Sequence, residues 1–228
     1  MNKYKLLVWM VILSVLAGLI NAIAIFGFGG TTVSHMTGLV SKFGISVACG
    51  DISGGMSLLF VIVMFFAGAV FAGILTGEKT FQLKKIYGYI VFVIGILLLL
   101  PPFLSAEHSI LLLAFLMGLQ NGMALSFKGV LFRSTHMSGN LTDLGTYVGY
   151  IIRGNKTEKP VSALIPGVSL LGFSIGGIIG ILLYSCIGNY VFAAAAAVYF
   201  LLGIVYFSLR KRCNSSGVKG TVLVDTSP

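Results

Sequence analysis

The chain has 228 residues, of which 57% are hydrophobic and only 9% are charged. Its mean hydropathy of +1.02 lies far above that of water-soluble domains, so the composition indicates an integral membrane protein. The formal net charge of +9 does not indicate a nucleic-acid partner. The Lys and Arg residues form short clusters between apolar runs, where membrane proteins use them to fix orientation, rather than one basic face.

Six apolar runs follow one another along the chain, each long enough to cross a bilayer as a helix. A helix needs about 20 residues to cross a hydrocarbon core ~30 Å thick. The predicted spans are residues 6–28, 56–76, 86–104, 109–127, 164–184 and 190–209.

The basic residues predict how these spans are oriented. With six spans and a cytoplasmic N-terminus, every Lys and Arg except Lys42 lies on the cytoplasmic side. Two additional crossings, giving eight spans, would move several of these residues outside. We therefore expect both termini in the cytoplasm, with residues 210–228 as a disordered cytoplasmic tail.

A stretch near the N-terminus is repeated about a hundred residues later. Residues 18–44 read GLINAIAIFGFGGTTVSHMTGLVSKFG, and residues 118–145 read GLQNGMALSFKGVLFRSTHMSGNLTDLG. In both, an Asn follows the first Gly by three residues, and a His-Met-Thr/Ser-Gly motif comes later. We interpret this match as a duplication. A signal peptide is the weaker interpretation of the N-terminus, since its cleavage site would adjoin the start of the repeat.

Each copy contains three spans, in residues 6–104 and 109–209. Because three is odd, the second copy must cross the membrane in the opposite orientation to the first. The prediction is a single transmembrane domain, residues 1–209, of the all-α class. Its six transmembrane helices form two inverted three-helix repeats, a design that places transporter substrates at the interface between the repeats.

Each copy also contains a long polar connection, residues 29–55 and 128–160, which carries the His motif. Both are long enough to enter the bilayer as a helix and return, at ~1.5 Å of rise per residue. We expect re-entrant or broken helices that meet near the midplane, with Thr37 and Ser138 as helix caps. The alternative is an amphipathic helix on each membrane surface. Small residues at 69 and 73, and at 172, 176 and 180, predict close helix packing.

Polar residues within these segments are the candidate binding residues. Amides inside a span are costly unless they are paired, and a His in both copies is compatible with solute recognition or proton relay. We expect the two imidazoles to be buried near the midplane, close to the two Asn side chains. The candidates are Asn21, His35, Thr37, Gln120, Asn121, His136, Ser138, Asn140 and Asp143. A soft-metal site is an alternative, but two His and two Met are few ligands for it. We therefore predict no metal or cofactor.

The repeated motifs resemble the signature stretches of the YoaK family, a group of bacterial six-span membrane proteins of unknown function. The matching segments are residues 18–22, 34–38 and 135–143, and the resemblance covers nearly the whole chain except its tail. It implies a bacterial plasma-membrane protein but no substrate. Leu39 departs from the pattern, since such proteins often have Asn there, as at Asn140.

These observations predict a secondary transporter or channel-like permease for a small solute, with proton or ion coupling as a further expectation. We predict no enzymatic activity and no nucleic-acid partner. We expect the chain to lie in the lipid bilayer, with a homo-oligomer as one form that it can adopt. Two alternatives stay open: a membrane-embedded enzyme or metal-binding protein that uses the paired histidines, and a membrane scaffold or assembly protein.

Overall fold

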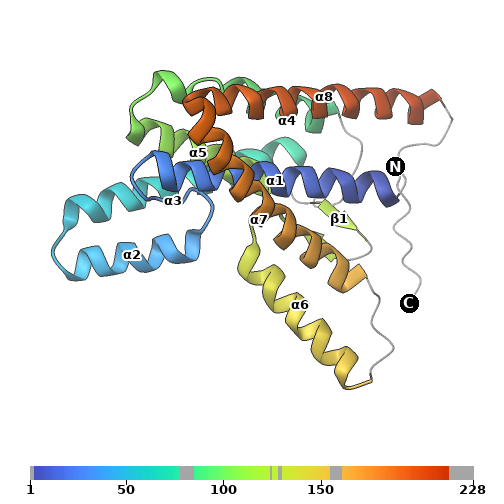
Figure 1. Cartoon of the computed structure of the whole chain (residues 1–228), viewed down its shortest axis with the longest axis horizontal. Helices are drawn as coiled ribbons and strands as arrows, with labels where there is room; N and C mark the ends of the chain where they lie inside the picture. The colour runs from blue at the N-terminus through green and yellow to red at the C-terminus, as the bar shows by residue number, and fades with distance from the viewer. Residues whose placement is uncertain (1–2, 78–84, 124, 128–129, 155–160, 216–228) are drawn as a thin grey trace.

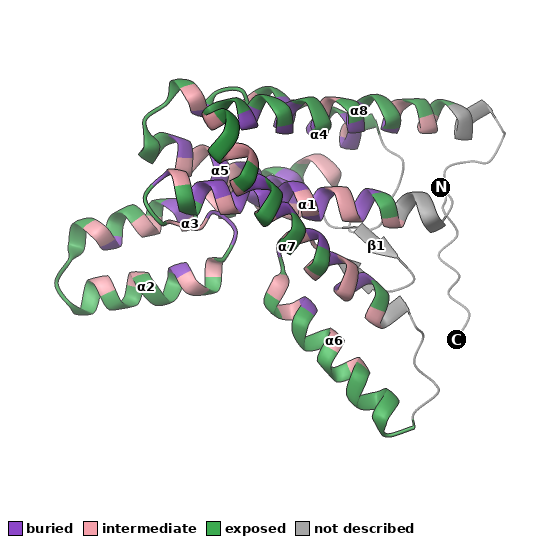
Figure 2. Ribbon diagram, in the orientation of Figure 1, coloured by how far each residue is buried: buried purple, intermediate pink, exposed green. Residues whose placement is uncertain are grey.

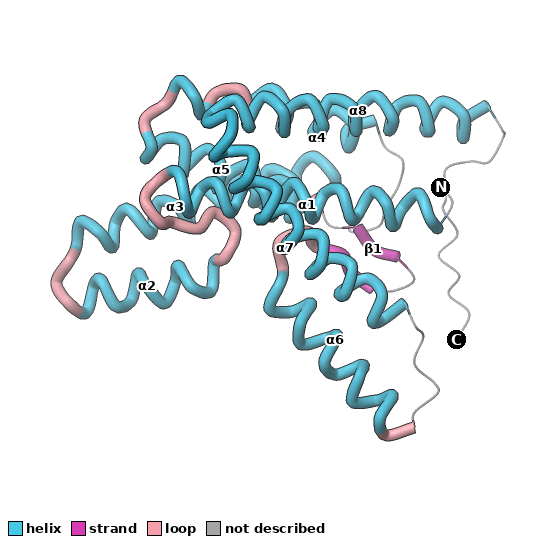
Figure 3. Tube along the Cα trace, in the orientation of Figure 1, coloured by secondary structure: helices cyan, strands magenta, loops and turns pink. Residues whose placement is uncertain are grey.

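A computed structural model describes residues 3–77, 85–123, 125–127, 130–154 and 161–215. The regular structure in these residues is helical apart from one short antiparallel hairpin, which confirms the predicted helical class (Figures 1 and 3). The elements are α1 (Lys3–Gly27), α2 (Met36–Ala48), α3 (Ile52–Thr76), α4 (Lys85–Leu97), η1 (Pro101–Phe103), α5 (Ala106–Gly122), β1 (Leu125–Phe127), β2 (Val130–Phe132), α6 (Met137–Ile152), α7 (Val161–Ile187), η2 (Gly188–Tyr190) and α8 (Val191–Ser215).

Four helical stretches in the described residues are long and apolar enough to cross a membrane: Leu7–Gly27, Ile52–Thr76, Lys85–Phe103 and Ala163–Lys211. The last has 49 residues because it joins α7 and α8 through the 3-10 turn η2. The helix α5 is not one of them: it has 17 residues, about 26 Å of helix, and carries polar side chains at both of its ends. The described residues thus contain several helices that could span a membrane, but these four stretches do not confirm the six spans expected.

Large apolar side chains cover the outer faces of the helices. Ile74 on α3 is 73% exposed, and Leu171 on α7 is 66% exposed. By contrast, most of α1 is buried in the middle of the bundle (Figure 2). Leaving an aliphatic side chain in water instead of burying it costs about 1.5–3 kcal/mol. A surface of this kind fits a helix bundle that is surrounded by lipid.

Two close helix crossings organise the bundle, α1 with α7 and α5 with α3. Both depend on a glycine at the start of the repeated stretch. A side-chain carbon at Gly18 would overlap the carbonyl oxygen of Phe173, and one at Gly118 would overlap the carbonyl oxygen of Phe65. The backbones approach this closely only because glycine has no Cβ.

Each crossing also has a glycine on its other helix. Gly176 on α7 lies against the carbonyl oxygen of Val15, and Gly68 on α3 lies against that of Phe115. Gly172 and Gly180 also face α1, so the predicted packing row on α7 is confirmed. The predicted row on α3 is partly wrong, since a Cβ at Gly73 would meet no atom within 4 Å and Gly68 makes the close contact instead.

Several predicted boundaries are corrected. α5 ends at Gly122 rather than at residue 127, and residues 125–127 form strand β1 instead, because short apolar runs do not distinguish strand from helix. α4 ends at Leu97, before the two prolines, rather than at residue 104. α8 continues to Ser215, so residues 210–215 are helical rather than disordered. The rest of the predicted tail, 216–228, lies outside the described residues.

The two polar connections contain α2 and α6. Both helices begin near the middle of the molecule, where α1 and α7 cross, and run outward in different directions (Figure 1). α2 packs against α3, and α6 packs against α7. A loop leads into α2 in the first copy, whereas strand β2 and a short loop lead into α6 in the second. The inward loops are marked in Figure 3.

Candidate functional site

The two histidines of the repeated motif occupy the same position in their helices. His35 precedes α2 with φ −99° and ψ 71°, and His136 precedes α6 with φ −85° and ψ 59°. Both are N-cap residues, and neither side chain makes a capping hydrogen bond. The expectation that Thr37 and Ser138 would be the caps is therefore wrong, because both lie inside the first helical turn.

The glycine of each motif makes room for the imidazole. A Cβ at Gly38 would overlap the ring of His35, and a Cβ at Gly139 would overlap the ring of His136. Each ring is thus folded over the first turn of its helix. This contact explains the His-x-x-Gly spacing in physical terms, since any larger residue at the Gly position would displace the ring.

Matching residues of the two copies line one central cavity of about 590 Å³. The loop into each helix, its first turn and one phenylalanine from each crossing all contribute. The matched lining residues are Asn21 and Asn121, Ser34 and Thr135, His35 and His136, Met36 and Met137, Thr37 and Ser138, and Phe65 and Phe173. Ile25, Gly30, Thr32 and Lys42 line it from the first copy.

Asn21 holds the first connection in place. Its Oδ1 accepts hydrogen bonds from the Thr32 hydroxyl at 2.7 Å and from the backbone N–H groups of Val33 and Ser34 at 3.1 and 3.2 Å. The Thr32 hydroxyl in turn accepts a bond from the backbone N–H of His35 at 3.1 Å. Through this chain of bonds, an amide on α1 positions the histidine that begins α2.

Gln120 holds the second connection by different bonds. Its Nε2 donates to the Ser134 hydroxyl at 2.8 Å and to the carbonyl oxygen of Leu13 at 3.0 Å. Its Oε1 accepts a bond from the hydroxyl of Tyr199 on α8. Gln120 is buried and does not line the cavity, so its bonding groups are already occupied by protein.

The Asn that matches Asn21 has no comparable role. The Oδ1 atom of Asn121 is buried and has no hydrogen-bond partner among the described residues, although Asn121 lines the cavity. Asn140, which is 6% exposed, likewise has an Nδ2 without a partner there. Its match in the first copy is Leu39, which is fully buried.

The structure brings together six of the nine candidate residues: Asn21, His35, Thr37, Asn121, His136 and Ser138. Gln120 and Asn140 are buried outside the cavity lining, and Asp143 is exposed on α6, also outside it. The expectation of buried imidazoles is wrong, because both histidines are exposed where they line the cavity. The described residues contain no group of three or more His, Cys, Asp or Glu that could hold a metal ion.

Sequence reasoning missed three kinds of lining residue. Phe65 and Phe173 lie within apolar spans, where nothing in the sequence distinguishes them from lipid-facing residues. Thr32 lies only three residues before His35, so its position beside the motif was an available signal. Lys42 was also detectable, as the one basic residue outside the clusters that were expected in the cytoplasm.

A family model described as "Protein of unknown function (DUF1275)" matches residues 9–205. This match contains both copies of the repeat and nearly all of the described helices. No curated protein and no solved structure matches the chain.

Proposed function

Because the chain belongs to the DUF1275 family, whose description names no activity, we propose a function from the cavity itself: the protein is a permease for a small solute that binds there. The observation that carries this proposal is the set of matched residues from both copies around one cavity. Sites at the interface of two repeats, beside the ends of interrupted helices, are typical of secondary transporters. Transport rather than catalysis is the proposed role.

The reciprocal glycine contacts support two inverted repeats. Gly18 lies against the α7 backbone of the second copy, and Gly118 lies against the α3 backbone of the first. A twofold axis through the bundle would exchange these contacts. Counting α5 and treating α7 and α8 as separate crossings gives six spans, three in each copy. We therefore keep the inverted six-span arrangement as part of the proposal.

The proposed location is the bacterial plasma membrane, with both termini in the cytoplasm. The distribution of Lys and Arg supports this orientation. Cys49 and Cys186 are exposed and free, and both are expected on the outer side. An impermeant thiol reagent added to intact cells should label both residues. Labelling of either only after lysis would overturn the orientation.

Ligand-dependent thermal stabilisation of the purified full-length protein tests the permease proposal. Ions, amino acids, nucleobases and organic acids form the panel. A solute that binds in the cavity should stabilise the native protein but have much less effect on His35→Ala and His136→Ala, which should insert and fold normally. The same solute should enter proteoliposomes that contain the native protein.

Gly44→Ala is a matched control, because a Cβ at Gly44 would meet no atom within 4 Å. It should respond to the solute like the native protein. Solute binding that survives both histidine substitutions would overturn the cavity as the binding site. Binding without entry into proteoliposomes would overturn transport.

A further inference from the structure

The formal charge on the lining of the central cavity is positive. Lys42 lines it, and no Asp or Glu does so among the described residues. Its other polar groups are imidazoles, amides and hydroxyls, all of which can donate hydrogen bonds. A cationic solute would find no formal negative charge in this lining, whereas an anionic solute would find a lysine.

The first turns of two helices also face the cavity. Met36 and Thr37 of α2 and Met137 and Ser138 of α6 line it. Each helix N-terminus carries roughly half a positive charge and backbone N–H groups that have no partner within the helix. Two such ends at one cavity favour an anion between them.

These two ends differ from the N-termini of the neighbouring helices. Asp51 caps α3 through a 2.9 Å bond from the N–H of Gly54, and the Ser105 side chain caps α5. His35 and His136 make no such bond. No cap side chain therefore occupies the donors of the two helix ends that face the cavity, although the N–H of Met137 donates to the carbonyl oxygen of Thr135.

Apolar groups make up the remainder of the lining. Phe65 and Phe173 lie at the two glycine crossings, where close backbone contact fixes their positions, and Ile25 lines the cavity on the first copy's side. A volume of about 590 Å³ also exceeds the needs of a halide ion. A solute with an apolar part suits this cavity better than a bare inorganic ion.

We infer that the solute is a small organic anion. Its carboxylate lies between the N-termini of α2 and α6, within reach of Lys42, and its apolar part lies against Phe65 and Phe173. This inference rests on the permease proposal, because it names the solute class for the same cavity.

Two series of probes, each with one apolar part and a head group that is anionic, neutral or cationic, test the solute class. The first is benzoate, benzamide and benzylammonium, and the second is butyrate, butyramide and butylammonium. Calorimetric titration of the purified full-length protein at constant ionic strength measures their affinities. We expect the carboxylate to bind at least about tenfold more tightly than its amide and ammonium counterparts in one series or both, as a charge-assisted hydrogen bond predicts. Chloride and sulfate should bind more weakly than the carboxylate.

Preference for an amide or ammonium probe in both series would overturn the inference, as would equal binding of chloride or sulfate. The permease proposal would survive such a result if the preferred solute still lost its affinity in His136→Ala. Absence of measurable binding for all six probes would also overturn the inference. The wider solute panel would then test the permease proposal separately.

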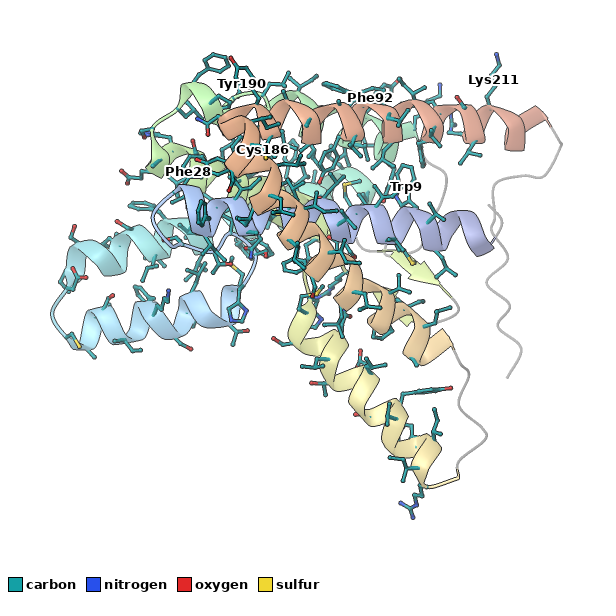
Figure 4. All side chains as sticks on the ribbon, viewed as in Figure 1. Trp9, Phe28, Phe92, Cys186, Tyr190 and Lys211 are labelled. Atoms are coloured by element: carbon teal, nitrogen blue, oxygen red, sulfur yellow. The ribbon has the colours of Figure 1, made fainter. Side chains whose placement is uncertain are left out.

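Substitutions of lysine test the position of the carboxylate. Lys42→Gln should weaken carboxylate binding about five- to tenfold, and Lys42→Arg should retain most of it. Lys211→Gln is the matched control: it removes the same charge from an exposed residue near the end of α8, where Figure 4 shows Lys211 pointing away from the bundle. Equal affinity in native protein and Lys42→Gln would overturn the assigned position.

Discussion

The two connections present the same motif to the cavity but are fastened by different side chains. In the first, Asn21 on α1 accepts three bonds from the loop that leads to His35. In the second, the matching Asn121 has an unpartnered oxygen among the described residues, and the neighbouring Gln120 bonds to Ser134 instead. The residue that matches Gln120 in the first copy is Ile20, which is fully buried.

This difference separates two kinds of requirement. The cavity requires His, Met, a hydroxyl and Gly at fixed places, and both copies supply them. Holding the loop requires only that its polar groups be satisfied, which different amides can achieve. Within the two connections, the matched residues that line the cavity are therefore the better guide to the proposed binding, whereas the amide that fastens each loop differs between the copies.

The largest expected effect tests whether the two crossings are equivalent. Gly18→Ala and Gly118→Ala should each destabilise the protein by about 3 kcal/mol, because the new methyl group overlaps a backbone oxygen that cannot move independently. Thermal unfolding in detergent measures both. Gly145→Ala is the control, since a Cβ there would meet no atom within 4 Å, and it should be neutral or slightly stabilising. Tolerance of alanine at only one of the two crossings would break the equivalence.

Gln120→Leu should have the next largest effect. It removes the partner of the Ser134 hydroxyl, the Tyr199 hydroxyl and the Leu13 carbonyl, all in buried surroundings. We expect a loss of about 2–3 kcal/mol in the free energy of unfolding. Gln120→Met keeps a side chain of similar length but has no amide, so comparison with Gln120→Leu separates loss of the hydrogen bonds from loss of packing. Stability like that of the native protein in Gln120→Leu would show that Gln120 does not hold the loop.

The paired asparagines should respond differently to the same substitution. Asn21→Ala removes the acceptor of three bonds and should cost about 1–2 kcal/mol of stability. Asn121→Ala should cost less than about 0.5 kcal/mol, because no described residue bonds to its buried oxygen. Its main effect should be on solute affinity. Equal losses of stability would mean that the two asparagines have the same structural role.

The smallest expected effect is an increase in the free energy of unfolding. Asn140→Leu places the first copy's residue in the second copy and removes a buried N–H₂ group that has no described partner. We expect stabilisation of about 1 kcal/mol, measured by the same unfolding experiment. The reverse change, Leu39→Asn, buries an amide at a fully buried position and should destabilise. Destabilisation by Asn140→Leu would indicate that Asn140 has a polar partner after all.

The sequence predicted the parts of the site that repeat. The sequence alone predicted that His35 matches His136 and that each lies in a long polar connection. This was possible because a duplicated polar motif is easily recognised between apolar segments. The structural role of Gln120 was not readable, because its partners Leu13 and Tyr199 are about 80 to 110 residues away and share no motif with it. The contributions of Phe65 and Phe173 depend on which helices cross, and hydrophobicity alone does not determine this.

Each close crossing joins a helix of one copy to a helix of the other, and this determines when helices find their partners during synthesis. Gly18 on α1 finds its partner Phe173 only after about 150 further residues have been made. At ~5–20 residues per second, α1 is without its partner helix for about 8 to 30 s. The bonds of Asn21 come from residues only 11 to 13 positions later, so the first copy can satisfy its own polar groups during this interval. Gln120 finds Leu13 already made and reaches Ser134 only 14 residues later, so its N–H groups can be paired early and only its oxygen waits for Tyr199 on the last helix, α8.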